Sequence, residues 1–594
     1  MTVGLTPNIP GIIPYVPEEV AEFDSIIAKF KSNEMTEQEL VNHRLPRGVY
    51  GQRQPDRQMM RIKIPLGFLH ANQLDVLADV IEKYAPLGKD HFTTRENMQI
   101  HHIPLVDTTT IMRMLGAVGL TTREACGNTV RNVTGCALAG VCPDELFDAT
   151  PYASAFARYF VRRDFAQKMP RKFKTAFVGC KEDHAVVRIH DMGFVGVVRE
   201  IDGKQVRGFR IVVGGGTSIE AIIAPILYDF ITVDDGSYLR VTEAVLRVFN
   251  KADELRKNRM RARIKILIKR IGIDAFRALV EEELKQPWSK DAIDMPSLLA
   301  SAPGEGKAPA FSEFVKPSAS EKDFPEWVRT NTVRQKQAGY FAAFVSVPLG
   351  DVTPEQSRGL AAVARKHGTS HLRVSFDQNV AIRWIPGGSL YGLWKDLVAL
   401  GLGAPGARKV TDVVSCPGTD SCKLGITSSM GLNRAVRDVL AENPDLVADP
   451  LIEEMHIRIS GCPNGCGQHH LGDLGFHGAC RVGEQKMQLP AYEAFIGAIY
   501  EDTNVRYGLR LRGKVLAKKL PSFIVAVLSH YRAERQEGER FAAFVDRVGR
   551  APFESIIAQF DELPAFNPQA PGFYQDWDRT ALYKVERGEG ECAM

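Results

Sequence analysis

The sequence predicts an α+β protein built from two related halves, because two short motifs recur at nearly the same offset. Pro65-Leu-Gly recurs as Pro348-Leu-Gly, 283 residues later, and Ile103-Pro recurs as Ile385-Pro, 282 residues later. Between these motifs each half reads strand–helix–strand, with alternating apolar residues in the strands and helical periodicity between them. Two recurrences at nearly one offset indicate an internal duplication. We therefore expect duplicated halves that pack together about a pseudo-two-fold axis.

The bulk composition argues against several classes of protein. A formal net charge of +4 over 594 residues does not indicate a nucleic-acid partner. The sequence has no apolar run long enough to span a membrane, and its N-terminus lacks the basic and apolar regions of a secretory signal. We therefore expect a cytoplasmic protein whose ten cysteines serve metal binding or catalysis rather than a disulfide framework.

Two cysteine pairs carry the strongest chemical signal. Cys416 and Cys422 enclose five residues in SCPGTDSC, and Cys462 and Cys466 enclose three in GCPNGC. Four thiolates suit zinc or an iron–sulfur cluster, and the five-residue gap is wider than the usual zinc spacing. The spacing favours a [4Fe–4S] cluster. The alternatives are buried free cysteines and a non-catalytic protein with a structural zinc on the four cysteines.

This cysteine pattern resembles that of the sulfite and nitrite reductase hemoprotein family, and most closely that of assimilatory sulfite reductases. The resemblance covers about residues 50–538 and implies a siroheme coupled to the [4Fe–4S] cluster. It further implies that Cys466 both binds the cluster and bridges to the siroheme iron. Asn464 also falls on a position of the family's cofactor site.

Basic residues gather at three places in the first half. Lys172 and Lys174 share one face of a predicted strand among apolar neighbours, where two ammonium groups repel unless an anion lies between them. A solvated strand face is the alternative. The resemblance implies that four of these side chains bind the substrate anion and help to deliver protons: Arg95, Arg131, Lys172 and Lys174.

Two further stretches fit the binding of a flat, carboxylate-bearing cofactor. A glycine triplet ends a predicted strand, where the backbone can approach a ligand closely, although most such triplets mark simple turns. The segment 258–269 is a predicted basic amphipathic helix, which by itself favours a solvated face. The resemblance makes both stretches cofactor-binding, and Arg171, beside Lys172, is a further candidate. The candidates are Gly214, Gly215, Gly216, Arg171, Arg261, Arg263 and Lys265.

Other candidates are weaker. Tyr50 and Cys126 match positions that are covalently linked beside the siroheme in some relatives, although a packed aromatic and a core thiol are the alternative. Three histidines near the second cysteine pair are expected to be core or supporting residues: His469, His470 and His477. The remaining cysteines receive no role, since buried thiols are the default: Cys136, Cys142, Cys180, Cys480 and Cys592.

The expected reaction is the six-electron reduction of sulfite to sulfide, with nitrite reduction to ammonia as the alternative. In the family, plant-type nitrite reductases carry Asn where Lys174 stands and sulfite reductases carry Lys. A second cation favours the sulfite dianion. No G-x-G-x-x-G motif opens a nucleotide-binding unit, so we expect an external electron donor, either a ferredoxin or a flavoprotein.

The expected domain boundaries combine the duplication, the resemblance and composition. Pro, Ser, Ala and Lys are frequent around residues 301–320, which is typical of a linker. We expect an N-terminal arm at 1–54 with one helix near 18–31, ferredoxin-like half-repeats at 55–125 and 333–405, a siroheme and substrate domain at 126–285, a linker at 286–332, a cluster domain at 406–549 and a tail at 550–594.

Overall fold

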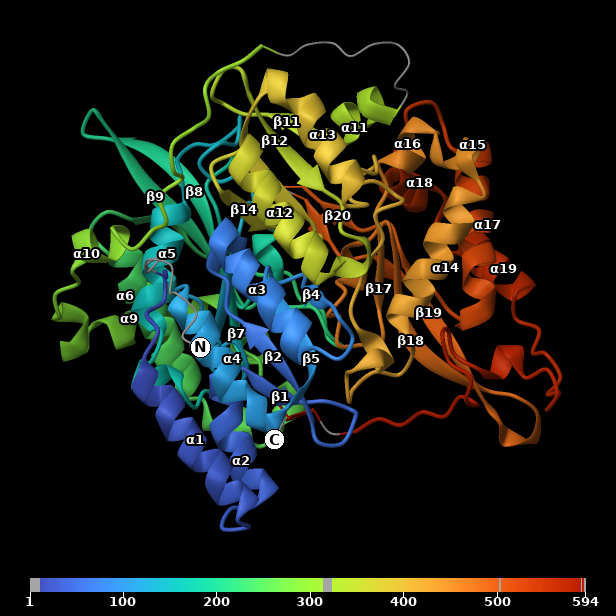
Figure 1. Ribbon diagram of the computed structural model, residues 1–594, viewed down its shortest axis with the longest axis horizontal. Coiled ribbons are helices and arrows are strands. Elements are labelled where there is room, and N and C mark those ends of the chain that lie inside the picture. Colours follow the sequence, from blue (N-terminus) through green and yellow to red (C-terminus); the bar gives the residue numbers. More distant parts are fainter. Residues whose placement is uncertain (1–10, 314–322, 502–503, 589, 592–594) are drawn as a thin grey trace.

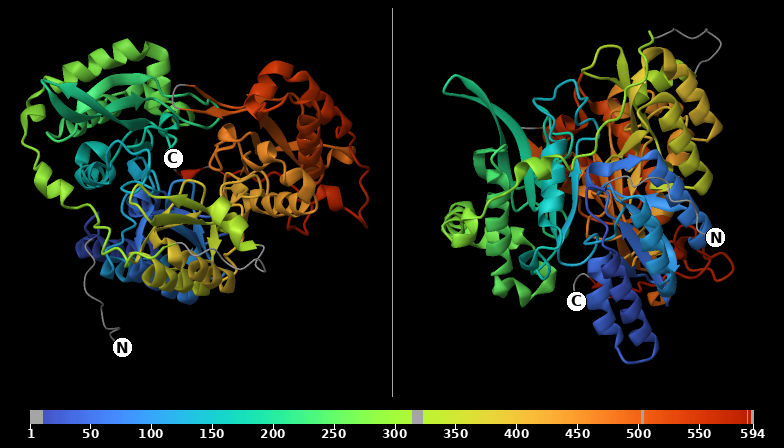
Figure 2. Two further views of the ribbon diagram at one scale, coloured as in Figure 1. Left: turned by 90° about the horizontal axis from the view of Figure 1, so that it is seen from above. Right: turned by 60° about the vertical axis from the view of Figure 1, so that its left-hand side comes forward.

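The computed structural model describes residues 11–313, 323–501, 504–588 and 590–591. The chain forms three lobes that meet at the centre of the molecule (Figures 1 and 2). One lobe combines the early and middle segments of the chain, so the two half-repeats lie together. The other two lobes are formed by the segments that follow each half-repeat.

Helices alternate with short strands throughout. The helices are α1 Pro17–Lys31, α2 Glu37–Arg44, α3 Ala71–Tyr84, α4 Thr108–Ala117, α5 Thr150–Phe160, α6 Ser237–Asn250, α7 Asp253–Arg256, α8 Ile264–Ile271, α9 Ile273–Leu284, α10 Met295–Leu299, α11 Asp323–Asn331, α12 Pro354–His367, α13 Leu390–Ala399, α14 Ser429–Ala441, α15 Pro444–Val447, α16 Pro450–Glu453, α17 Leu520–Glu534, α18 Phe541–Val548 and α19 Ala551–Gln559. The strands are β1 Val49–Gly51, β2 Arg57–Ile62, β3 Phe68–His70, β4 Asp90–Phe92, β5 Met98–Pro104, β6 Val130–Gly135, β7 Phe173–Val178, β8 Met192–Ile201, β9 Lys204–Val213, β10 Ile226–Thr232, β11 Thr332–Arg334, β12 Tyr340–Val345, β13 Asp351–Val352, β14 His371–Val374, β15 Val380–Pro386, β16 Val414–Ser415, β17 Ile457–Ser460, β18 Leu474–Val482, β19 Gln488–Ile496, β20 Ile499–Tyr500, β21 Val505–Arg506, β22 Leu509–Arg510 and β23 Val515–Leu516.

The two half-repeats exchange a strand. One sheet has the order β1-β2-β5-β4-β13, and the other has the order β11-β12-β15-β14-β3. Strand β13 therefore completes the sheet of the first half, while β3 completes that of the second. Buried residues from both halves and from α1 form one continuous apolar core. This reciprocal pairing confirms the internally duplicated α+β architecture.

The Pro-Leu-Gly motif makes the exchange possible. In both copies it forms one turn of 3₁₀ helix directly before the exchanged strand. A Cβ atom on Gly67 would lie 2.1 Å from the carbonyl oxygen of Val374, and one on Gly350 would lie 2.6 Å from that of Phe92. Both glycines also have positive φ, at 63° and 73°. Only glycine fits a turn packed this closely against the other half.

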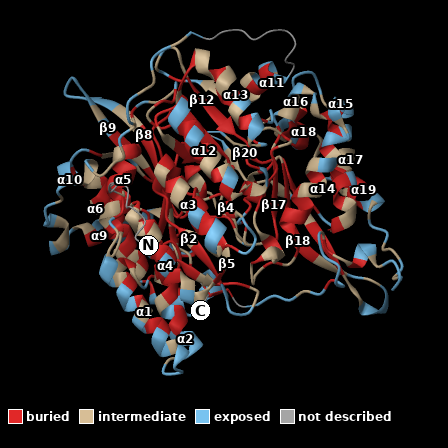
Figure 3. Cartoon of the chain, in the orientation of Figure 1, coloured by how far each residue is buried: buried red, intermediate tan, exposed pale blue. Residues whose placement is uncertain are grey.

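The two remaining large sheets are also equivalent to each other. Strands β6, β7 and β8 run parallel, and β9 and β10 then pair antiparallel. The second sheet repeats this pattern, with β16, β17 and β18 parallel and β19 and β22 antiparallel. Each sheet has its own core, and buried strands fill the centre of the molecule (Figure 3). The duplication thus extends beyond the half-repeats to the domains that follow them.

The N-terminal segment contains one more helix than the expected arm. Helix α1 matches the expected helix, but α2 was not expected. It begins with a capping box, in which the Thr36 hydroxyl accepts a hydrogen bond from the Glu39 backbone and the Glu39 carboxylate accepts one from the Thr36 backbone. Such a reciprocal cap stabilises a short helix.

The segments expected as linker and tail both contact other elements of the fold. Within 286–332, the described residues include α10 and α11, and Phe324 and Trp327 of α11 are fully buried. The tail also runs along the loop that carries Cys422. There the Ser428 backbone N–H donates to Asp576 at 2.7 Å, and the Gly588 N–H donates to the Lys423 carbonyl at 3.0 Å.

The tail ends against the N-terminal segment. Both terminal nitrogens of Arg44, on α2, donate to the Glu591 carboxylate, at 2.5 and 2.7 Å. The Gly51 backbone N–H and the Lys423 ammonium also donate to it, at 2.9 and 3.1 Å. This buried ion pair joins α2, β1 and the cysteine loop. Cys592 lies outside the described residues. No helix within the described ranges is both long and apolar enough to cross a bilayer.

Candidate active site

The four motif cysteines follow two adjacent parallel strands. Cys416 comes directly after β16, and Cys462 comes two residues after β17. Because β16 and β17 are parallel, their carboxyl ends lie at one edge of the sheet and bring the two pairs together. The Gly461 backbone N–H donates to the Cys416 sulfur at 3.2 Å. Cys466 is the exposed member of the set, and the other three are buried or half-buried.

The sulfurs influence one another electrostatically. Burial, together with the neighbouring Cys466 and Cys416 sulfurs, raises the pKa of the Cys422 thiol to about 11. Burial likewise raises the pKa of Cys462 well above its ordinary value, with the other three cysteines adding to the effect. Such thiols ionise only when a cationic group is bound between them.

The spacing of the sulfurs fits a cluster better than a single ion. Four thiolates on one tetrahedral zinc ion lie about 3.8 Å apart. Within the described part of the chain, no three of these four sulfurs all lie within 4.8 Å of one another. A cubane cluster binds one thiolate at each of its four iron corners and needs a wider spacing.

The Cys466 loop lies between two elements of the first half. The Thr94 hydroxyl donates to the Cys466 carbonyl at 2.8 Å, and the Gln468 amide donates to the Thr94 carbonyl at 3.3 Å. On the other side, a Cβ atom on Gly465 would lie 3.0 Å from the side chain of Thr217, which follows the glycine triplet. The Arg95 turn, the Cys466 loop and the glycine triplet thus form one site.

Cations gather beside Cys466. Burial holds the pKa of the Lys174 ammonium well below its ordinary value. Three neighbouring positive charges lower that pKa further: Lys172, Arg263 and Arg95. The nearby Cys466 sulfur acts in the opposite direction. The structure therefore brings Arg95, Lys172 and Lys174 near one another, and a bound anion would relieve the repulsion among their charges.

Arg95 is fixed by residues of two neighbouring strands, β6 and β7. Its guanidinium donates to the Thr134 hydroxyl at 3.0 Å and to the carbonyls of Asn132 and Thr175, at 2.5 and 3.1 Å. Arg131 is buried and donates to the carbonyls of Gly127 and Ala125, both at 2.8 Å. Each arginine is held in place by backbone oxygens beside the group of cations.

Asp191 organises this group, although no motif in the sequence indicates it. Its buried carboxylate accepts two hydrogen bonds from Arg263, both at 2.7 Å, and one from the Lys174 backbone N–H at 2.8 Å. Asp191 is 72 residues from Arg263 in the chain, so only the fold brings them together. Lys63 was also missed. Its ammonium lies 4.0 Å from the Glu124 carboxylate, and burial lowers its pKa to about 8.

The expected cofactor-binding residues divide into two groups. Lys265 donates to the carbonyls of Gly216 and Thr217, at 3.2 and 2.7 Å, so it fixes the end of the glycine triplet. A Cβ atom on Gly216 would lie 3.1 to 3.2 Å from the side chains of Lys265 and Arg263, so the glycine lets these two cations lie close to the backbone. Arg261 lies apart, exposed and paired with Glu220 at 3.0 Å.

The expected basic helix is shorter than predicted, and the remaining cofactor candidates lie near β7, β9 and the second cysteine pair. In place of one helix over 258–269, a 3₁₀ turn at Arg259–Arg261 precedes α8. Arg171 and Asn464 are both half-buried, at the start of β7 and in the second cysteine loop. Gly214 and Gly215 are buried at the end of β9.

Tyr50 packs against a small apolar cluster that contains Cys126, so the structure brings this pair together. His469 and His470 stack at 3.9 Å between ring centroids, and His477 and Phe495 pack against His469. Burial lowers the pKa of His470 to about 3, which keeps this imidazole neutral. The three histidines are core residues.

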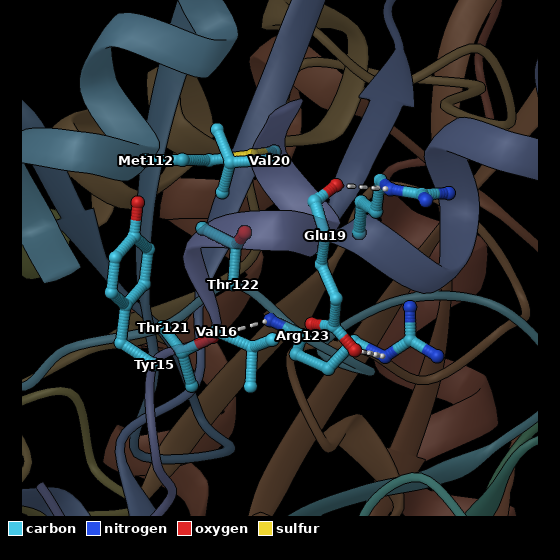
Figure 4. Close-up of a pocket in the computed structure, with 9 residues that line it drawn as sticks. Tyr15, Val16, Glu19, Val20, Met112, Thr121, Thr122 and Arg123 are labelled. Atoms are coloured by element: carbon cyan, nitrogen blue, oxygen red, sulfur yellow. Dashed lines mark hydrogen bonds and ion pairs between the residues drawn. The ribbon is translucent and has the colours of Figure 1, made fainter. Parts of the chain in front are cut away.

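A separate recess lies between α1 and the segment 121–123 (Figure 4). It is lined by Tyr15, Glu19 and Arg123 among others, and Glu19 pairs with Arg162 and Arg123 at 2.8 and 3.7 Å. Because its charged groups are paired and it contains none of the cysteines, it is a packing recess of the N-terminal segment.

Comparison with known proteins agrees with this geometry. The family described as nitrite and sulphite reductase 4Fe-4S domain matches residues 126–288 and 406–562. The companion ferredoxin-like half domain of nitrite/sulfite reductase matches residues 50–118 and 333–400. The chain belongs to the siroheme and [4Fe–4S] nitrite and sulfite reductase family. The match extends to residue 562, beyond the resemblance seen in the sequence.

The reductases most similar to this chain include both named activities. A sulfite reductase [ferredoxin] of Mycobacterium tuberculosis is 30% identical over 493 residues, 82% of each chain. An assimilatory ferredoxin-dependent nitrite reductase of Haloferax mediterranei is 28% identical over 550 residues, 89% of each chain. The solved structure of the Mycobacterium tuberculosis NirA protein superposes with a TM-score of 0.76 at 27% identity, covering 91% of this reductase and 96% of NirA.

The residues present fit both family cofactors. The four cysteines supply the soft thiolates that an iron–sulfur cluster needs. They lie within the matched 4Fe-4S domain, which sets aside the structural zinc alternative for this set. The cations beside Cys466 suit a carboxylate-rich siroheme and its anionic substrate. The absence of a Cβ atom at Gly216 leaves room for the side chains of Lys265 and Arg263.

Proposed function

We propose that this reductase converts sulfite to sulfide. The observation that carries the proposal is the position of the Lys174 ammonium, which lies within the electrostatic influence of Lys172, Arg95 and the Cys466 sulfur. Sulfite has three oxygens and a second negative charge, whereas nitrite has two oxygens and one charge. Three clustered cations therefore complement sulfite better.

The side chains have separate parts in the proposed reaction. Bound siroheme would supply an iron at which single electrons from the cluster reach the substrate. Arg95 is fixed by three acceptors and can donate to the anion without reorganising. Lys174 releases a proton more readily than an ordinary lysine, because burial and its cationic neighbours lower its pKa. Reduction of sulfite consumes six electrons and seven protons and yields hydrosulfide and three waters.

A Lys174→Asn change tests the choice of substrate. We expect the ratio of kcat/KM for sulfite to that for nitrite to fall about tenfold or more, since one charge-assisted hydrogen bond is lost. Sulfide and ammonium production with reduced methyl viologen measures the ratio. Lys204→Asn, at an exposed position on β9, is the matched control and should leave the ratio unchanged. An unaltered ratio in the Lys174 variant would remove the electrostatic argument for sulfite.

Nitrite reduction to ammonia is the second candidate. It is supported by the names of relatives such as the Haloferax mediterranei enzyme. The same names support a ferredoxin as the external donor. We propose ferredoxin over a flavoprotein. Turnover with reduced ferredoxin, compared with turnover by an NADPH-dependent flavoprotein reductase, distinguishes the two donors.

We also propose a thioether link between Tyr50 and Cys126 in the mature enzyme. It is supported by the packing of Tyr50 against the cluster that contains Cys126. Formation of the link breaks the Cys126 S–H bond and one ring C–H bond of Tyr50, and a two-electron oxidant such as dioxygen must accept the two hydrogen atoms. Peptide mass spectrometry should therefore find one joined peptide lighter than the two separate peptides by two hydrogens. Two unmodified peptides from the cofactor-loaded enzyme would contradict it.

A further inference from the structure

A second set of metal-ligand residues lies outside the active site. Cys136 and Cys142 enclose five residues, and Cys180 and His184 enclose three. These are the spacings of the cluster motif. Cys136 precedes Cys416 by 280 residues, and His184 precedes Cys466 by 282. The second set thus lies at the offset of the internal duplication.

The fold places this set at the equivalent position in the other sheet. Cys136 comes directly after β6, and Cys180 comes two residues after β7, as Cys416 and Cys462 follow β16 and β17. Strands β6 and β7 are parallel neighbours, so their carboxyl ends lie together. A bridge between Glu145 and Cys180 fixes the second loop against the first.

The four side chains converge on one point. Their ligand atoms all lie within 4.8 Å of one another. The Nδ1 atom of His184 lies 3.7 Å from the Cys136 sulfur and 3.6 Å from the Cys142 sulfur. In a tetrahedral zinc site with bonds of about 2.3 Å to sulfur and about 2.0 Å to nitrogen, the two ligands lie about 3.6 Å apart. The observed distances match a single ion.

The contrast with the cluster cysteines is informative, because both sets share one spacing in the sequence. The sulfurs of the cluster set are too far apart for one ion, whereas the second set is compact. A histidine also replaces the cysteine equivalent to Cys466. Three cysteines and one histidine are an established ligand set for structural zinc.

The surroundings support metal binding. The Leu138 backbone N–H donates to the Cys136 sulfur at 3.4 Å, as in sites that stabilise a thiolate. The Nε2 atom of His184 lies 3.5 Å from the Glu182 carboxylate, which can orient the ring with Nδ1 toward the sulfurs. The three cysteines are buried and form no disulfide.

An entry path for an ion is present. A cavity of about 300 Å³ is lined by Cys136, Cys142 and His184 on one side. On the other side it is lined by residues of the second half, including Phe344, Asp377 and Arg408. An ion here would fix the loops after β6 and β7 where the two halves meet.

We propose that Cys136, Cys142, Cys180 and His184 bind one structural zinc ion, at a site equivalent by duplication to the cluster site. The ion joins two loops of the domain that carries the substrate-binding cations. Its role is separate from the proposed reduction of sulfite.

Metal analysis of the as-purified holoenzyme tests the site. After dialysis against EDTA, we expect about one zinc per chain in addition to the iron of the cofactors. Cys136→Ser and His184→Ala should lose that zinc and keep the iron, whereas His184→Cys should retain zinc. Cys480→Ser is the matched control, because this half-buried cysteine lies outside both sets and its thiol donates to the Arg481 carbonyl. Retention of zinc by both Cys136→Ser and His184→Ala would overturn the assignment.

Zinc-edge X-ray absorption of the wild-type enzyme decides the case even if the variants do not fold. We expect about three sulfur ligands at about 2.3 Å and one nitrogen ligand at about 2.0 Å. Wild-type enzyme without zinc would overturn the proposal. So would about four extra irons per chain, which indicate a second cluster, or a zinc shell of oxygen and nitrogen only, which indicates an adventitious ion.

Discussion

Replacement of Cys466 by Ser is expected to lower the rate of sulfite reduction on the order of 10³-fold, or about 4 kcal/mol in the activation barrier. A serine hydroxyl ionises far less readily than a thiol and is a poor ligand for a soft metal centre. The loop around Cys466 contacts the Arg95 turn directly, so no other cysteine can take its place beside the cations. Turnover with reduced methyl viologen measures the loss.

The control for this change is Cys480→Ser, which replaces a cysteine outside both ligand sets. It should keep the wild-type rate. Iron and siroheme contents of both variants separate loss of a cofactor from loss of electron transfer. A Cys466 variant within about threefold of the wild-type rate would contradict the proposed role of this residue.

A Glu591→Ala change is expected to destabilise the protein by about 3–5 kcal/mol. Arg44 and Glu591 side chains are 2% and 1% exposed, so the change leaves a buried guanidinium without its carboxylate. We expect the apparent unfolding midpoint to fall by more than about 5 °C, and the tail to become sensitive to proteolysis.

The same ion pair predicts a pH dependence. Burial alone would raise the pKa of the Glu591 carboxyl. The hydrogen bonds and charge of Arg44, the Gly51 N–H and the Lys423 ammonium together outweigh burial and hold the pKa below its ordinary value. The stabilisation is therefore present at neutral pH, where the carboxylate is charged in both states. It is lost as the pH falls below the ordinary carboxyl range and through the lowered pKa.

Glu586→Ala is the matched control for Glu591→Ala. Glu586 lies in the same tail, but it is 69% exposed and 3.8 Å from Arg53. An exposed pair of this kind contributes about 1 kcal/mol or less. If the two variants unfold at the same midpoint, the buried pair does not fix the tail.

The sequence predicted the duplicated halves and the cysteine set because both leave local signals. Pro65-Leu-Gly and Pro348-Leu-Gly recur since each turn packs against the opposite half and tolerates no Cβ at its glycine. The cysteine spacing is also a local signal, because each pair lies in the loop that follows one strand. The strand exchange between the halves could not be predicted, because the sequences of β3 and β13 do not indicate which of the two sheets each strand joins.

Groups that contact residues far away in the sequence were missed, because such contacts leave no local signal. Asp191 binds Arg263 from another element, and no spacing indicates this contact. The sequence assigned no contacts to the tail, yet the structure buries Glu591 against a partner 547 residues away. The spacing of the second ligand set is visible in the sequence. Only the structure shows that the three sulfurs and the histidine ring converge on one point.

Competitive turnover by the wild-type holoenzyme tests the central claim most directly. Sulfite and nitrite are supplied together at equal concentration with reduced methyl viologen, and sulfide and ammonium are quantified in the same reaction. The cations around Lys174 predict a larger kcat/KM for sulfite, and therefore more sulfide than ammonium. A larger kcat/KM for nitrite would contradict the account.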